Sequence, residues 1–150
     1  MTFNKIAALA FAGVMTLGVV ATVAQDTFVA PTTPEAAVAA REALMKSNGA
    51  TLKAAGALTG PEAAAAMQTL LDNFTHMPAT FTEGSIVGDS EALPAIWQNW
   101  EAFNAIIETG KTAAADGMAA AETGDMTAYG VALKTIGGTC GTCHQQFRAK

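Results

Sequence analysis

The chain has 150 residues, of which 13 are Asp or Glu and 8 are Lys or Arg, so its net charge at neutral pH is −5. An acidic chain of this length, without a cluster of basic residues, suits one domain and argues against binding to nucleic acid or to anionic membrane surfaces.

Residues 1–24 have the order of a secretory signal peptide. One basic residue, Lys5, precedes an uncharged run from Ile6 to Ala24 that ends in small residues, and this order favours cleavage after Ala24 or Ala21. An uncleaved membrane anchor is the alternative, because a span takes about 20 apolar residues. We expect the leader to be removed, leaving residues 25–150 as one domain that is exported to the periplasm and is free of the membrane.

The first two predicted helices cover residues 34–57 and 58–74. Thr32 and Glu35 have the spacing of a capping box, and Asn48-Gly49 is expected to weaken the first helix midway. Residues 75–93 contain Pro, Gly and Ser and predict a long loop.

The last two predicted helices cover residues 94–116 and 125–150, separated by a turn at 117–125. Ile96, Trp100, Phe103 and Ile107 follow the spacing of one buried helical face. No segment alternates with period two. Four amphipathic helices in one small domain predict an all-α, antiparallel four-helix bundle.

The C-terminal helix contains both cysteines of the chain in the sequence Cys140-Gly141-Thr142-Cys143-His144. C-x-x-C-H is the attachment signature of c-type haem. On a helix, residues three and four apart share one face. Cys140 and Cys143 can then bond the two vinyl groups of one porphyrin edge, while His144 reaches the iron. The motif therefore predicts one covalent haem c near the C-terminal helix.

Three other interpretations of this motif stay open at this point. Structural zinc needs four ligands, and His76 is the only further histidine. A thioredoxin-type dithiol expects a βαβ context, which the predicted helices do not provide. A chance match is the third.

Three stretches give the chain its resemblance to a known family. "CGTCHQQFR" places the motif in the last helix, "LPAIWQNWEAF" opens the third helix, and "REALMKSNG" lies in the first. These stretches resemble the class II c-type cytochromes, meaning cytochrome c′ and its low-spin relatives, and they are closest to the low-spin members. The resemblance covers nearly all of residues 25–150 and implies the same bundle with the haem at its C-terminal helix.

The resemblance also implies roles for residues of the first helix. Met45 takes the position over the distal face of the haem, either as second axial ligand or packed above the iron as an apolar neighbour. Arg41, one turn earlier, is expected to contact a haem propionate, and Arg148 to lie beside His144. Met67, Met126 and His76 are weaker candidates for an iron ligand.

Two functions follow as expectations. The first is a periplasmic monohaem electron carrier, not an enzyme, whose iron is held by His144 and Met45 and which meets redox partner proteins. The second is a five-coordinate, high-spin cytochrome c′ that binds NO or CO, with Met45 only packing. Either protein is compatible with a monomer or a homodimer.

Overall fold

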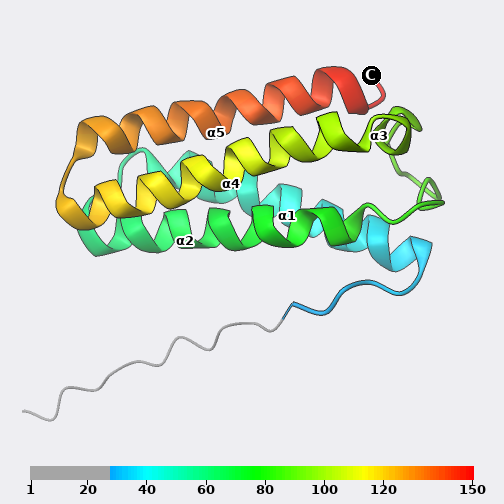
Figure 1. Cartoon of the computed structure of the whole chain (residues 1–150). Coiled ribbons are helices and arrows are strands. Elements are labelled where there is room, and N and C mark those ends of the chain that lie inside the picture. The colour runs from blue at the N-terminus through cyan, green and yellow to red at the C-terminus, as the bar shows by residue number, and fades with distance from the viewer. Residues whose placement is uncertain (1–27) are drawn as a thin grey trace, which may run out of the picture.

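The computed structural model describes residues 28–150, so the signal peptide predicted at residues 1–24 lies outside the described residues. Four long helices run side by side, each antiparallel to the one before it, as Figure 1 shows. They are α1 (Pro34–Ala55), α2 (Gly60–His76), α4 (Trp100–Thr123) and α5 (Met126–Phe147). A 3₁₀ turn, η1 (Met77–Thr80), follows α2, and a one-turn helix, α3 (Ala95–Gln98), precedes α4. The predicted all-α four-helix bundle is confirmed.

Local sequence signals account for the helix ends. The Thr33 Oγ accepts a hydrogen bond from the backbone N–H of Ala36 at 3.2 Å, so the cap of α1 is Thr33 and the prediction of Thr32 was wrong by one residue. The Asp125 Oδ1 accepts from the N–H groups of Thr127 and Ala128 at 3.1 and 2.9 Å. Gly124 ends α4 at a positive φ of 77°, a conformation that costs glycine little.

The turn predicted at 117–125 was wrong, because α4 continues to Thr123. Gly117, interpreted as a turn residue, lies in the helix where α4 meets two neighbours. A Cβ at this position would lie 2.7 Å from the Met67 Cε and 2.9 Å from the Ala132 Cβ. From sequence alone, a glycine that permits two helices to approach closely cannot be distinguished from a glycine that ends a helix. The packing around Gly117 shows that it is of the first kind.

Two smaller differences concern the first and third predicted helices. The Asn48-Gly49 pair does not interrupt α1, since Asn48 is buried and its Oδ1 accepts from the Asn73 Nδ2 at 2.9 Å. Asn99 separates α3 from α4, and Trp100, expected on the buried face, is 39% exposed.

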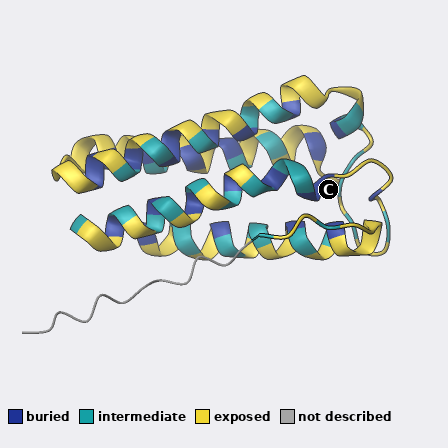
Figure 2. Ribbon diagram, turned by 60° about the horizontal axis from the view of Figure 1, so that its bottom comes forward, coloured by how far each residue is buried: buried dark blue, intermediate teal, exposed yellow. Residues whose placement is uncertain are grey.

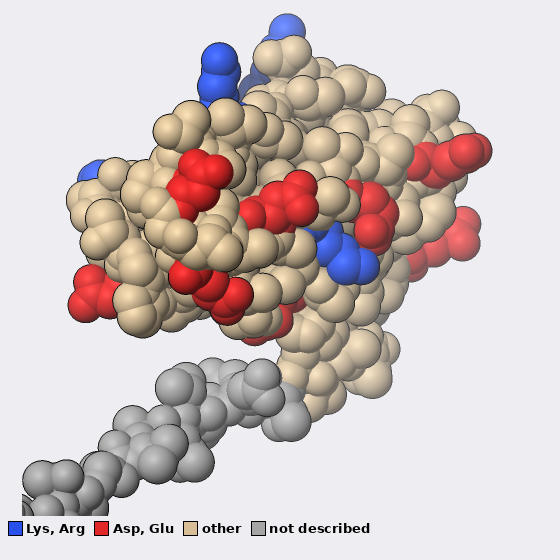
Figure 3. Space-filling model, turned by 60° about the vertical axis from the view of Figure 1, so that its left-hand side comes forward, with Lys and Arg blue, Asp and Glu red and all other residues tan. Residues whose placement is uncertain are grey.

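The hydrophobic core lies mainly between α2, α4 and α5, where the inward faces are buried and the outward faces exposed (Figure 2). α1 packs mainly against α2 and makes few contacts with α5. Acidic side chains are spread over the face shown in Figure 3. None of the helices among residues 28–150 is long and apolar enough to cross a bilayer.

Candidate haem site

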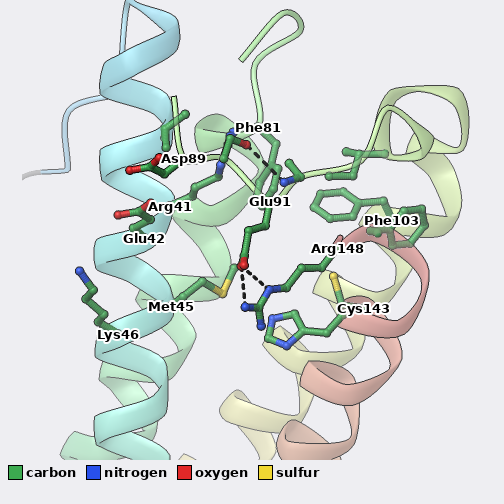
Figure 4. A pocket seen from close by; sticks show the side chains of 16 residues that line it. Arg41, Glu42, Met45, Lys46, Phe81, Asp89, Glu91, Phe103, Cys143 and Arg148 are labelled. Atoms are coloured by element: carbon green, nitrogen blue, oxygen red, sulfur yellow. Dashed lines mark hydrogen bonds and ion pairs between the residues drawn. The ribbon is translucent and has the colours of Figure 1, made fainter. Parts of the chain in front are cut away.

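A cavity of about 340 Å³ opens where α1 and α5 are held apart, at the end of the bundle that carries α3 (Figure 4). Its walls come from α1 (Val38, Arg41, Met45), the 80–93 loop (Phe81, Ser90, Glu91), α3 and α4 (Ile96, Phe103), and the end of α5 (Cys143, His144, Phe147). Four of the five predicted site residues, all but Cys140, therefore line one cavity.

Cys140 and Cys143 lie one turn apart on α5, both are half-buried, and no disulfide joins them. Cys143 lines the cavity, while the Cys140 Sγ donates to the Ile136 carbonyl at 3.6 Å, just outside the lining. Burial raises the pKa of the Cys143 thiol to about 11, and the neighbouring Cys140 adds to the rise. Burial also raises the pKa of Cys140. Both sulfurs are thus neutral at physiological pH.

His144 lies at the cavity wall in the last turn of α5. Burial lowers the pKa of its imidazole, the positive charge of Arg148 lowers it further, and Glu91 opposes them. The neutral imidazole is the form that binds a metal. This end of α5 therefore presents His144 in the protonation state that an iron ligand needs.

Met45 projects from α1 into the same space from the opposite wall, and Figure 4 shows its sulfur turned toward the α5 side. The side chain is half-buried and packs against the core. Arg41, one turn earlier, also lines the cavity but is only 6% exposed. The α1 stretch that the family resemblance singled out is therefore brought opposite the C-x-x-C-H motif.

The guanidinium of Arg41 donates four hydrogen bonds, all to the 80–93 loop. One terminal nitrogen bonds the Thr80 carbonyl at 3.4 Å and the Ser85 Oγ at 2.9 Å. The other bonds the Ser85 carbonyl and the Ser90 Oγ, both at 2.5 Å. The guanidinium also lies 5.2 Å from the centre of the Phe81 ring. The contact of Arg41 with a haem propionate stays a prediction, and these loop contacts were not expected from the sequence.

Several residues near the cavity were not predicted from the sequence, because they lie in an irregular loop. Glu91 and Arg148 form an ion pair, in which the Arg148 Nε donates to the Glu91 Oε2 at 2.6 Å. The backbone of Ala92 pairs with that of Arg148 in an isolated bridge. The only signal in the sequence was the length of the 75–93 segment, which carries no periodicity that would place a residue.

The weaker ligand candidates lie away from the cavity. Met67 is buried in the core between α2 and α4, and Met126 is exposed at the start of α5. The His76 ring stacks on Phe28 with centroids 4.2 Å apart. Within residues 28–150, no three His, Cys, Asp or Glu side chains gather in a way that could hold a metal ion, so the described residues give the zinc interpretation no support.

The cavity fits a haem by the chemistry of its walls. Eight of the sixteen lining residues are apolar, aromatic or cysteine. Among them Phe103 is 1% exposed and lies in edge contact with Phe81 and Phe147. Cys140 and Cys143 would hold the porphyrin edge and His144 would bind the iron, while Met45 lines the cavity from the opposite helix, α1. A bound haem would supply a redox-active iron at this place.

Comparisons with known proteins agree with this geometry. The family model described as Cytochrome C' matches residues 36–148. The cytochrome c' of Rhodospirillum rubrum is 39% identical over 108 residues, covering 70% of this chain and 71% of that protein.

Two solved structures are similar in fold. A cytochrome c' described as having an unusual ligand-controlled dimer dissociation has a TM-score of 0.71 and 27% identity, covering 81% of this chain and 100% of that one. A nitric oxide complex of a variant cytochrome c prime from Alcaligenes xylosoxidans has a TM-score of 0.68 and 23% identity, covering 79% and 98%. With the family model spanning the bundle from α1 to the haem motif, the chain belongs to the cytochrome c' family and carries one covalent haem c.

Proposed function

We propose that this protein is an exported electron carrier whose haem iron is ligated by His144 and Met45. The observation that carries the proposal is that these two side chains line one cavity from opposite helices, α5 and α1. Imidazole and thioether together are the ligand pair that raises the potential of a c-type haem.

A bound haem would supply a one-electron Fe(III)/Fe(II) couple, and the chain would hold and tune it. Cys140 and Cys143 fix the porphyrin covalently, so the group stays with the chain in both oxidation states. Phe81, Phe103 and Phe147 give the cavity an apolar wall, and apolar surroundings disfavour the more highly charged form of a bound metal group. No bond in a substrate is made or broken, so the protein acts as a carrier rather than an enzyme.

A gas-binding cytochrome c' is the second candidate, and the similar structures favour it. One of them is a nitric oxide complex and another is described by ligand-controlled dimer dissociation. In this form Met45 would pack over the iron without bonding it, and NO or CO would bind to the distal face. A homodimer would be the expected assembly, since one similar protein is described by its dimer dissociation.

Export rests on the leader at residues 1–24, which favours the periplasm as the place of action. Its partners there would be donor and acceptor redox proteins. The excess of acidic residues, 13 against 8 basic ones of which Lys5 belongs to the leader, favours partners with a basic docking surface, because complementary charge speeds association.

The deciding experiment is the absorption and EPR spectrum of the ferric protein at neutral pH, for the natural chain and for Met45→Ala. A low-spin signal with a sulfur-to-iron charge-transfer band, lost in Met45→Ala, supports the carrier. Met118→Ala is the matched control, because Met118 is a partly buried methionine of α4 outside the cavity. A high-spin natural protein that binds CO readily contradicts Met45 ligation and supports the gas-binding form.

A further inference from the structure

The 80–93 loop connects the two walls of the haem cavity. On one side, Arg41 of α1 bonds loop residues Thr80, Ser85 and Ser90. On the other side, the Leu93 N–H donates to the Phe147 carbonyl at 3.0 Å. The loop thus reaches from the helix of Met45 to the helix of His144.

The C-terminal attachment has two further contacts. The Ala149 N–H donates to the Glu91 carbonyl at 2.8 Å, and the Glu91 carboxylate pairs with Arg148. Because α1 itself makes few contacts with α5, this loop is a main connection between the two walls at the cavity end. Figure 4 shows the Glu91–Arg148 pair between them.

Arg41 and Met45 are four residues apart on α1, so their side chains project from the same face of the helix. A contact that fixes the position of Arg41 therefore also restricts the rotation of α1 about its axis and its shift along that axis at Met45. The four terminal N–H groups of Arg41 are all used by the loop, and the side chain is 6% exposed. The guanidinium is therefore positioned by the loop on several sides at once.

We propose that Arg41 is a positioning residue that clamps the 80–93 loop onto α1 and thereby holds Met45 over the distal face of the haem. The proposal rests on the haem lying between Met45 and His144, as in the proposed function. It differs from the propionate contact expected by resemblance, because it assigns the terminal nitrogens of Arg41 to protein acceptors.

The chemistry of arginine suits this clamp and that of lysine does not. A guanidinium presents planar donors in fixed directions, whereas an ammonium is a point donor on a flexible stem. Arg41→Lys keeps the positive charge but cannot serve Thr80, Ser85 and Ser90 together. Any effect of Arg41→Lys is therefore due to the lost hydrogen-bond geometry of the guanidinium and not to a lost charge.

Ser85→Ala supplies the second variant. Ser85 is fully buried and is not among the residues lining the cavity, so it has no route to a haem propionate. Its Oγ accepts from Arg41 at 2.9 Å and donates to the Thr82 carbonyl at 2.6 Å. Removing this hydroxyl loosens the clamp from the loop side while leaving α1 unchanged.

The test measures the affinity of free imidazole for the ferric holoprotein, because imidazole must displace or pass Met45 to reach the iron. We expect Arg41→Lys to tighten imidazole binding about tenfold and Ser85→Ala to tighten it by a smaller factor, as coupled contacts in one network do. Lys53→Gln is the control, since Lys53 is an exposed cation of α1 that does not line the cavity, and it should leave the affinity unchanged.

The double variant separates the clamp from a propionate contact. If Arg41 acts through Ser85, the effect of Arg41→Lys shrinks in the Ser85→Ala background. The proposal would be overturned if the two substitutions changed the imidazole affinity by independent factors that multiply in the double variant. It would also be overturned if neither single variant changed that affinity. The spectrum of the natural protein decides the proposed function separately: in a high-spin protein Met45 is a guard instead of a ligand, and the same comparison still tests whether Arg41 holds it.

Discussion

The two ends of the bundle are stabilised in different ways. At the end carrying the α1–α2 and α4–α5 connections, helices approach closely through small residues: Gly117 faces Met67 and Ala132, and the Tyr129 hydroxyl donates to the Ala55 carbonyl at 3.0 Å. At the other end, α1 and α5 stand apart around a cavity of about 340 Å³. There an irregular loop, held by hydrogen bonds of Arg41 and by the Glu91–Arg148 pair, connects them.

The closely packed end therefore mainly stabilises the fold, and the open end mainly binds the cofactor. The closely packed end is held by direct helix contact and by the buried Tyr129–Ala55 hydrogen bond. The open end needs a group to fill its cavity and polar contacts to set its width. Substitutions at the closely packed end should change the free energy of unfolding with little change in the haem absorption spectrum. Substitutions at the open end should change the haem spectrum or its ligand binding.

The largest effect is expected from removing the haem attachment. A Cys140→Ala, Cys143→Ala double variant prepared without haem should be poorly folded. Without the porphyrin the apolar walls of the cavity have no group to pack against, and lost burial costs about 25 cal/mol per Å² of apolar surface. The whole stability of a domain is only about 5–15 kcal/mol. Thermal unfolding followed by circular dichroism measures it. A native-like melting temperature would show that the open end needs no cofactor.

A smaller effect is expected at the closely packed end. In Gly117→Ala the new methyl meets the Ala132 Cβ at 2.9 Å, which cannot rotate away, so overpacking of about 1–3 kcal/mol should outweigh the gain in helix propensity. Gly130→Ala is the matched control on α5: nothing lies within 4 Å of its Cβ position, and it should be stabilising by about 0.5–1 kcal/mol. Denaturant midpoints of the two holoproteins should move in opposite directions, and a shift in the same direction would contradict the close packing.

The smallest effect is expected from the exposed ion pair at the open end. The Glu91 and Arg148 side chains are 56% and 48% exposed, and exposed pairs contribute about 0–1 kcal/mol. Arg148→Gln should therefore change the unfolding free energy by less than about 1 kcal/mol. A Glu91→Gln, Arg148→Gln cycle measures the coupling, and a loss of several kcal/mol would mean that this pair holds the loop more strongly than its exposure allows.

Much of the site was predictable because its chemistry is local. Cys140, Cys143 and His144 lie within five residues on one helix, so the helical repeat alone places them on one side of α5. Met45 and Arg41 were located by resemblance to the family, and the structure brings them to the same cavity. The partners of Arg41 were not predictable, since Thr80, Ser85 and Ser90 lie about forty to fifty residues away in a segment without periodicity.

The sequence by itself determined the helical pattern and the haem motif, because the periodicity of apolar residues and the C-x-x-C-H spacing are properties of neighbouring residues. Only the tertiary structure decided that Gly117 lies inside a helix, that α1 stands away from α5, and that the 80–93 loop joins them around Arg41. These features depend on which surfaces meet after folding, and no local stretch of sequence encodes the distance between two helices.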